Sequence, residues 1–256
     1  MCGEWRIMLT LFFSGTGNTK YIAERFSKNL NSECHSIEEN IDFTSFMKAH
    51  ECICVCYPIY ASRVPLIFVE FTRKYSESFK NKKVIILVTQ FLFSGDGARS
   101  FTDLFPKNHF DVIYAEHFLM PNNVCNFALL AVKNGSQNEK TIQRANKKID
   151  ETCDNIVNSK SVKRGFNGFS RFIGLSQGLY AYKIIEKGKR SVVIYDDCTA
   201  CGLCVDNCPT SNLTLVDNKI QHNNNCAVCY RCVNACPEMA ITAFLKTKPK
   251  RQYKGV

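Results

Sequence analysis

The chain has 256 residues, of which 45% are hydrophobic and 22% charged, an ordinary composition for a folded protein that argues against disorder. No apolar stretch approaches the about 20 residues that a membrane-spanning helix needs, since the longest, Val84–Phe93, already contains Thr89 and Gln90. The apolar start Ile7–Phe13 lacks the basic flank of a signal peptide, so we expect a buried strand there and a cytoplasmic protein.

The formal net charge of +10 comes from two segments rather than from one folded face. Residues 160–190 carry eight basic side chains and one acidic one, and residues 246–256 carry five basic ones. Residues 1–159 are nearly balanced, and residues 191–245 are acidic. Basic segments beside an acidic module favour docking onto that module or onto an acidic redox partner. We therefore expect no nucleic-acid partner.

Strand-like and helix-like stretches alternate from the N-terminus to Ser159. Continuous apolar strands between helices are typical of a parallel sheet that is covered on both faces. The expected fold class is therefore α/β, a doubly wound parallel sheet that binds its ligands beyond the carboxyl ends of the strands. In chain order, the expected elements are strand 6–13, helix 18–30, strand 51–57, helix 65–75, strand 83–89, helix 96–105, strand 111–119 and helix 137–159.

The first expected strand runs directly into a glycine-containing turn that opens the first helix. Backbone N–H groups at a helix N-terminus bind phosphate, and glycine lets the backbone approach it closely. No lysine follows as in a nucleoside triphosphatase, and no third glycine completes a dinucleotide-binding motif. The run resembles the FMN-phosphate loop of flavodoxins, and it lies where theirs does. The residues expected to bind the phosphate are Ser14, Gly15, Thr16, Gly17, Asn18 and Thr19.

The same resemblance implies that two further loops, after the third and fourth strands, contact the flavin ring. In the first loop, Tyr60 is expected to stack on the isoalloxazine, with Tyr57 as the alternative. Many flavodoxins have a glycine in this loop, whereas none lies between Tyr57 and Pro65 here. Arg63 is a candidate counter-charge for the reduced flavin. The expected ring contacts are Pro58, Tyr60, Ala61, Arg63, Gln90, Phe91, Ser94, Gly95 and Gly97.

The fifteen cysteines can be divided into groups by their spacing along the chain. Cys52, Cys54 and Cys56 alternate along an expected buried strand, where a free cysteine packs as a small hydrophobe. Eight others form two Cys-x2-Cys-x2-Cys-x3-Cys-Pro motifs, the first beginning at Cys198 and its repeat at Cys226. In a reducing compartment such a grouping indicates metal or cluster ligation rather than disulfides.

This spacing is that of bacterial two-cluster ferredoxins, in which the fourth cysteine of each motif ligates the other cluster. Zinc sites usually pair two Cys-x2-Cys units, so the third cysteine and the Cys-Pro of each motif argue against zinc. The expected ligands are Cys198, Cys201, Cys204 and Cys236 for one [4Fe–4S] cluster, and Cys226, Cys229, Cys232 and Cys208 for the other.

Motifs and composition divide the chain into four segments: a flavodoxin-like FMN-binding domain over 1–159, a basic, aromatic-rich helical connector over 160–190, an α+β ferredoxin-like domain over 191–245, and a basic tail over 246–256. Together they resemble the EFR family of flavodoxin–ferredoxin fusions, and the resemblance covers nearly the full chain. Met120–Asn123 looks like a stretch that lies near the flavin in that family, with a simple capping turn as the alternative.

One FMN and two clusters in a chain predict electron transfer, because a flavin exchanges one or two electrons and each cluster exchanges one. The protein is expected to link one- and two-electron carriers in anaerobic metabolism, with a ferredoxin, a reductase or an oxidoreductase as partner. The main alternative is an FMN-dependent reductase of a small organic substrate, with His109 and His117 as candidate proton donors. A redox or oxygen sensor is the third possibility.

Overall fold

The computed structural model describes residues 8–127, 130 and 132–256. A five-stranded parallel sheet forms its larger part, with the strand order β2-β1-β3-β4-β5. This confirms the doubly wound α/β arrangement. In such sheets the ligand binds at the carboxyl ends of the strands, at the point where the strand order reverses. The strands are β1 (Met8–Phe12), β2 (Glu33–Ser36), β3 (Cys52–Pro58), β4 (Lys83–Gln90) and β5 (Asp111–Leu119).

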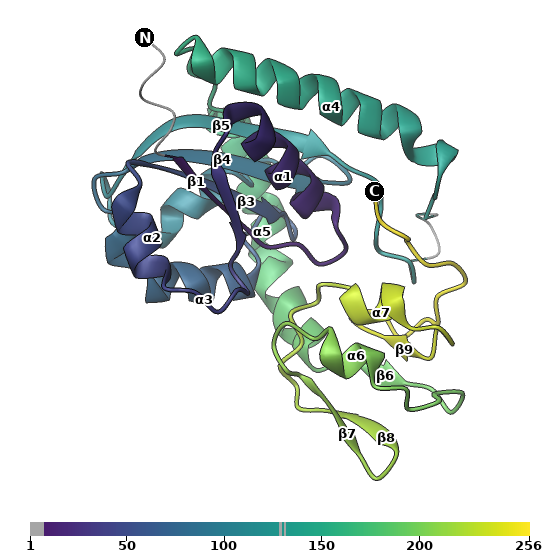
Figure 1. The fold of residues 1–256 in the computed structure, drawn as a ribbon. Helices are drawn as coiled ribbons and strands as arrows, with labels where there is room; N and C mark the ends of the chain where they lie inside the picture. The colour runs from purple at the N-terminus through teal and green to yellow at the C-terminus, as the bar shows by residue number, and fades with distance from the viewer. Residues whose placement is uncertain (1–7, 128–129, 131) are drawn as a thin grey trace.

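Helices cover both faces of this sheet (Figure 1). One face is covered by α1 (Asn18–Leu30) and α4 (Ser136–Val157). The other face is covered by α2 (Phe43–Ala49), α3 (Leu66–Lys74) and the short 3-10 helices η2 (Ser76–Phe79) and η3 (Arg99–Leu104).

The central strand β3 shows how the sheet fills both cores, because alternate residues of a strand point to opposite faces. Cys52, Cys54 and Cys56 pack under α1 and α4. Burial raises the pKa of Cys52 to about 12, so this thiol stays protonated and packs as an apolar group. The expectation that these three cysteines are structural is confirmed.

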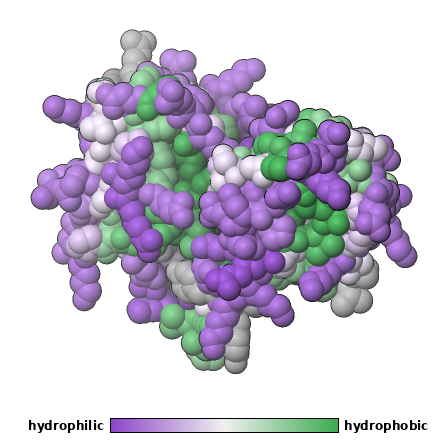
Figure 2. Space-filling model, turned by 90° about the horizontal axis from the view of Figure 1, so that it is seen from below, coloured by the Kyte–Doolittle hydropathy of each residue, from purple (hydrophilic) through white to green (hydrophobic). Residues whose placement is uncertain are grey.

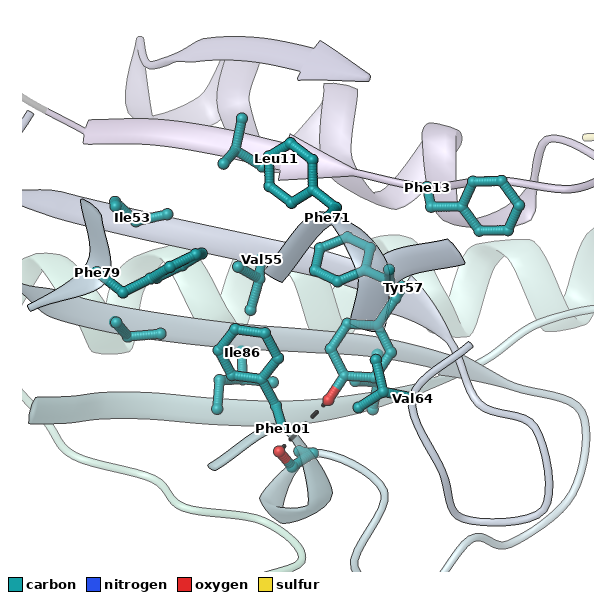
Figure 3. Close-up of a cluster of buried hydrophobic side chains, with 14 of the residues drawn as sticks. Leu11, Phe13, Ile53, Val55, Tyr57, Val64, Phe71, Phe79, Ile86 and Phe101 are labelled. Atoms are coloured by element: carbon teal, nitrogen blue, oxygen red, sulfur yellow. Dashed lines mark hydrogen bonds between the residues drawn. The ribbon is translucent and has the colours of Figure 1, made fainter. Parts of the chain in front are cut away.

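Tyr57 points to the opposite face and belongs to the aromatic core there. Its ring centroid lies 5.3 Å from that of Phe68 and 6.1 Å from that of Phe101, in the cluster that Figure 3 shows, and its hydroxyl donates to the Gly97 carbonyl at 3.0 Å. The residue is fully buried, so the expectation that it is an alternative stacking partner for the flavin is wrong.

The expected elements agree with the structure within a few residues, with two kinds of difference. The expected helix 96–105 is replaced by the shorter 3-10 helix η3. The elements β2 and α2 were not expected at all. Arg6 and Ile7, at the start of the first expected strand, lie outside the described residues.

The connector between the two parts contains α5 (Gly168–Lys189), a helix of 22 residues. Its buried face is built from small residues such as Ser170 and Gly174, so it packs closely on the turn after β4. Its opposite face leaves Phe169, Phe172 and Leu179 between 70% and 73% exposed. Hydrophobic residues also reach the surface in the view from below (Figure 2).

We expect Gly95→Ala to weaken the packing of α5. A Cβ at Gly95 would lie 2.3 Å from the Gly174 nitrogen and 2.4 Å from the Ser170 oxygen, both backbone atoms that no rotamer change can move away. Overpacking of this kind costs about 1–3 kcal/mol of unfolding free energy. Urea unfolding under anaerobic conditions measures this loss of unfolding free energy. Gly168→Ala is the control, because a Cβ at Gly168 meets nothing within 4 Å; equal stabilities of both variants would contradict the prediction.

The buried position of His117 predicts that the unfolding free energy of the protein depends on pH. Burial, followed by the charges of Arg164 and Lys148, lowers its pKa to about 3. In the unfolded chain the pKa is about 6.5, so below that pH the unfolded state binds the extra proton and the unfolding free energy falls with decreasing pH. The expected loss is about 1.4 kcal/mol per pH unit between roughly pH 6 and pH 3.

His117→Gln keeps an acceptor for the Ala98 N–H but does not titrate. Urea unfolding of the two proteins between pH 7 and pH 5 is therefore expected to show a shallower pH dependence for the variant. Parallel curves for wild type and variant would show that this histidine is not the group responsible.

The C-terminal part holds two small antiparallel sheets, β6 with β9 and β7 with β8, and two short helices. Its elements are β6 (Val193–Ile194), α6 (Leu203–Asp206), β7 (Leu213–Val216), β8 (Lys219–His222), α7 (Arg231–Ala235) and β9 (Ile241–Thr242). It is the expected α+β module. Among the described residues, no helix combines the length and apolarity that crossing a membrane requires.

Candidate functional site

A cavity of about 390 Å³ lies beyond the carboxyl ends of β1, β3 and β4, where ligands bind in open α/β sheets. Its size is within the usual range of ligand pockets. Most of the residues expected to contact FMN line this cavity. They are Ser14, Gly15, Thr16, Asn18, Thr19, Pro58, Tyr60, Ala61, Gln90 and Phe91.

The phosphate loop has the geometry of an anion site. Gly17 caps α1 with a φ of 99°, a left-handed conformation that glycine adopts without strain, and donates its N–H to Ser14 Oγ at 3.1 Å. The first N–H groups of any helix have no intrahelical acceptor, so those of α1 remain for a phosphate at the cavity. The residues present therefore fit an FMN phosphate.

The loop after β3 presents its residues to the cavity through a tight turn. Tyr60 and Arg63 exchange two backbone hydrogen bonds of 3.0 Å, and the residues between them, Ala61 and Ser62, have φ values of 48° and 61°. Two left-handed residues in succession make a type I′ turn. Tyr60 and Ala61 both line the cavity, whereas no glycine supplies the turn.

Other residues expected at the flavin lie against α5 instead. Arg63 pairs with the buried Asp96 at 3.2 Å. Ser94 donates its hydroxyl to Gln90 Oε1 at 2.5 Å, Gly95 contacts α5, and Gly97 packs on Ile59. Arg63, Ser94, Gly95, Gly97 and Gly17 are thus outside the cavity lining, and their contact with the flavin stays a prediction.

The two histidines considered as proton donors also lie elsewhere. His109 contacts the Ser76 carbonyl through Nε2 at 3.0 Å, and His117 is buried beside the sheet. Neither histidine lines the cavity.

The rest of the cavity wall comes from distant segments, of which only Met120–Asn123 was expected near the flavin, from the family resemblance. The stretch after β5 contributes through Asn123, which donates from Nδ2 to Thr16 Oγ1 at 2.8 Å and so is more than a capping turn. The remaining wall residues come from this stretch, from α5 and from the cysteine module. They are Met120, Pro121, Asn122, Asn123, Val124, Leu130, Ala181, Ile185, Val228, Cys229, Tyr230 and Phe244, and the wall also includes Ile59 after β3 and Thr89 of β4.

The eight motif cysteines surround two small cavities, and each cavity takes its fourth cysteine from the other motif. This is the exchange that two-cluster ferredoxins use. The first cluster site is lined by Cys198, Cys201, Cys204 and Cys236, and the second cluster site by Cys208, Cys226, Cys229 and Cys232.

Hydrogen bonds to the sulfur atoms repeat between the two sites. The Asn212 N–H donates to Cys208 Sγ at 3.2 Å, and the Ala240 N–H, at the matching place of the second motif, donates to Cys236 Sγ at 3.3 Å. Such bonds stabilise a thiolate ligand and tune the potential of a cluster. Burial raises the pKa of Cys204 to about 11 and that of Cys229 to about 12, so ligation must displace protons.

The motif cysteines line two cavities, four to each, which is the arrangement that two [4Fe–4S] clusters require. Among the residues that the structure describes, no three His, Cys, Asp or Glu side chains are arranged to hold one metal ion. A zinc ion needs its sulfur ligands about 2.3 Å from a single point. Thiols set around the walls of a cavity instead suit the corners of a [4Fe–4S] cluster.

One ligand joins the flavin cavity to the second cluster site. Cys229 lines both cavities, and Tyr60 lies beside it on the flavin side. Burial, followed by the neighbouring Cys229 and Cys226, raises the pKa of the Tyr60 hydroxyl well above its ordinary value. The cofactor sites therefore share a wall with no further layer of protein between them.

Comparison with known proteins agrees with this arrangement. The flavodoxin domain family matches residues 9–160, and two 4Fe-4S binding domains match residues 191–214 and 223–243. The comparison with curated proteins gave no match.

Solved structures similar to this chain include three bacterial proteins. General stress protein 14 of Treponema denticola, in complex with FMN, is 11% identical, with 58% of this chain and 98% of that chain covered and a TM-score of 0.43. The Trp repressor binding protein of Bacillus subtilis is 12% identical (55% and 96% covered, TM-score 0.40). A WrbA-like flavodoxin of Agrobacterium tumefaciens is 15% identical, with 57% of this chain and 96% of that chain covered and a TM-score of 0.36.

The flavodoxin match spans more than half of the chain, and the cavities hold the residue types that FMN and two cubanes require. The chain therefore belongs to the flavodoxin family, fused to two 4Fe-4S binding domains, and is an electron-transfer protein that carries FMN and two [4Fe–4S] clusters.

Proposed function

We propose that the protein links one-electron carriers to two-electron ones through a fixed series: first cluster site, second cluster site, FMN. The observation that carries this proposal is the position of Cys229, a ligand of the second cluster site that also forms part of the flavin cavity wall. When bound, FMN exchanges one or two electrons whereas each cluster exchanges one, so the series converts between the two kinds of carrier.

The first cluster site is the proposed entry for a partner protein. Cys201 is exposed, and Leu203 beside it is 40% exposed, so an incoming carrier can approach this cluster closely. The partner is a ferredoxin, a reductase or an oxidoreductase of anaerobic metabolism in the cytoplasm. The surrounding module is acidic, which favours a partner with a basic contact surface.

The chain's own contribution is to position the cofactors and to exclude water. Val228, Phe244 and Ile185 give the cavity an apolar wall opposite the phosphate loop. A closed, weakly polar surrounding strengthens electrostatic interactions and limits side reactions with solvent. The walls from both modules thus keep the flavin facing the second cluster site.

Anaerobic stopped-flow spectroscopy tests the series. A chemically reduced two-cluster ferredoxin is mixed with the protein, and bleaching of the flavin is followed. With Cys201→Ser, which removes a ligand of the first cluster site, we expect flavin reduction to slow by about tenfold or more while photoreduction of FMN is unchanged. Flavin reduction by the ferredoxin at the wild-type rate would overturn the proposed series.

A second candidate function, reduction of a small anionic substrate at the flavin, is favoured by a neighbouring cavity of about 290 Å³. It shares Phe91 and Met120 with the flavin cavity, and Lys133, Arg144 and Lys148 line it without any acidic residue. Small carboxylates or phosphate that perturb the flavin spectrum of the wild type but not of Arg144→Ala would support this candidate. Absence of any spectral change would remove it.

A further inference from the structure

The second cysteine motif packs directly on the phosphate loop, backbone against backbone. A Cβ at Gly15 would lie 2.2 Å from the Cys229 carbonyl oxygen, so only glycine permits this approach. On either side of Cys229, Val228 and Tyr230 line the flavin cavity. Part of the FMN site is therefore made by a segment whose shape depends on wrapping a cluster.

Arg231 ties this segment to the phosphate loop. Its guanidinium donates to the Ser14 carbonyl at 2.9 Å and to the Gly15 carbonyl at 3.2 Å. It also forms a two-pronged pair with the Glu38 carboxylate at 2.8 and 2.9 Å. A third contact, 3.2 Å to the Asn207 carbonyl, reaches the residue before Cys208, a ligand of the second cluster site.

The guanidinium thus holds together three segments that are far apart in the sequence. Planar Arg–carboxylate pairing fixes both distance and orientation, which a lysine does not reproduce. Two carbonyls of the phosphate loop are held by Arg231, and the first N–H groups of α1 are left without an intrahelical acceptor for a phosphate. We expect this support to disappear when the segment around Cys229 loses its cluster.

Comparison of the two cysteine motifs distinguishes the role of Arg231 from cluster ligation. When the two motifs are aligned on their cysteines, Arg231 corresponds to Leu203 and Tyr230 to Gly202. Gly202 and Tyr230 share a left-handed backbone, with φ values of 81° and 62°. The first motif surrounds its site with glycine and an exposed leucine, so ligation does not require tyrosine or arginine at these positions. An aromatic residue kept in a disfavoured conformation points to a local function instead.

We propose that FMN binding depends on an assembled second cluster, and that Arg231 is the positioning residue through which the cluster shapes the phosphate loop. The inference rests on the composite cavity of the proposed function. Its consequence is a chain that holds flavin only while the neighbouring cluster is intact. Loss of that cluster, through oxygen or lack of iron, then releases FMN rather than leaving a flavin cut off from its electron supply.

Matched cysteine variants test the dependence on each cluster. Cys229→Ser and Cys201→Ser occupy equivalent positions of the two motifs. Both proteins are prepared without oxygen, iron is counted, and the dissociation constant of FMN is measured by quenching of flavin fluorescence. We expect Cys229→Ser to weaken FMN binding by at least tenfold and Cys201→Ser to change it less than twofold. Equal effects of the two variants would overturn the inference.

Arg231→Gln tests the positioning role with all eight ligands in place. We expect full iron content, an FMN dissociation constant about tenfold higher, and only partial recovery with Arg231→Lys. Leu203→Gln, at the equivalent position of the first motif, is the control and is expected to bind FMN as the wild type does. Wild-type FMN affinity in Arg231→Gln with intact clusters would refute the role of Arg231.

These binding measurements are independent of the stopped-flow test of electron transfer. If FMN affinity is insensitive to the second cluster but ferredoxin still reduces the flavin through the first cluster, the series stands and the coupling fails. If FMN affinity depends on the second cluster but the rate of flavin reduction does not depend on the first, the coupling between cluster and FMN binding stands and the electron-transfer series fails.

Discussion

Gly15→Ala is expected to weaken FMN binding by about 10- to 100-fold, which corresponds to an overpacking cost of about 1–3 kcal/mol. The added Cβ would lie 2.2 Å from the carbonyl oxygen of Cys229 and 3.1 Å from its Cβ. The first of these is a backbone atom, so the two loops must move apart. Because both contribute to one cavity, their separation opens the flavin site and lengthens the path to the second cluster.

Fluorescence titration with FMN measures the loss of affinity, and stopped-flow reduction measures the slower transfer. Gly168→Ala is the control, since its added Cβ meets nothing within 4 Å and its backbone is helical. Gly17→Ala is unsuitable as a control, because its φ of 99° makes alanine strained there without any clash. FMN binding of Gly15→Ala at wild-type strength would mean that the two loops are not in contact in solution.

Local patterns were enough to predict most of the sheet. The strands β3 and β4 contain continuous apolar runs and β5 is mostly apolar, and α1 was predicted to its first and last residue because the glycine turn fixes its start. The strand β2 was missed because Glu33–Ser36 is polar and partly exposed at the sheet edge. The helix α2 begins after Asp42, whose side chain accepts from the N–H groups of Thr44 and Ser45. This N-cap residue was a signal from which the start of α2 could have been predicted.

The flavin site was predictable only on the side where motifs are local. The phosphate loop and the cysteine ligands follow from spacing along the chain, and the cavities contain them. The opposite wall is formed by residues such as Tyr230, which is very distant from Ser14 along the chain, and no spacing rule reaches that far. The ion pair of Arg63 with Asp96, which is buried beneath α5, was not predictable for the same reason.

The C-terminal segment is part of this unpredicted structure. Its charge suggested a basic tail, and one cation, Lys248, does pair with Asp197 of the cysteine module. The segment also carries Tyr253, which is 2% exposed and donates from its hydroxyl to Asn18 Oδ1 at 2.6 Å. Gln252 donates to the Cys236 carbonyl at 2.5 Å. Two residues of the tail thus connect the first turn of α1 with a cluster ligand.

Tyr253→Ala is accordingly expected to lower the unfolding free energy by about 3–5 kcal/mol, the usual cost of removing a buried aromatic ring. It leaves Asn18 Oδ1 without its donor, whereas the backbone N–H of residue 253, which Asn234 Oδ1 accepts at 2.7 Å, is kept. Tyr253→Phe removes only the hydroxyl and is expected to cost about 1–2 kcal/mol. Anaerobic urea unfolding, followed by far-UV circular dichroism and by release of FMN, separates the two effects.

Val256→Ala is the control within the same tail, because that side chain is half exposed and its truncation should change stability by less than about 0.5 kcal/mol. If the tail were only a basic appendage, all three variants would unfold alike. A graded loss from Val256→Ala through Tyr253→Phe to Tyr253→Ala, with FMN released earlier in the same order, would instead show that the tail closes the joint between the two modules. The joint holds the flavin against the second cluster, so its stability sets the conditions under which the electron path exists.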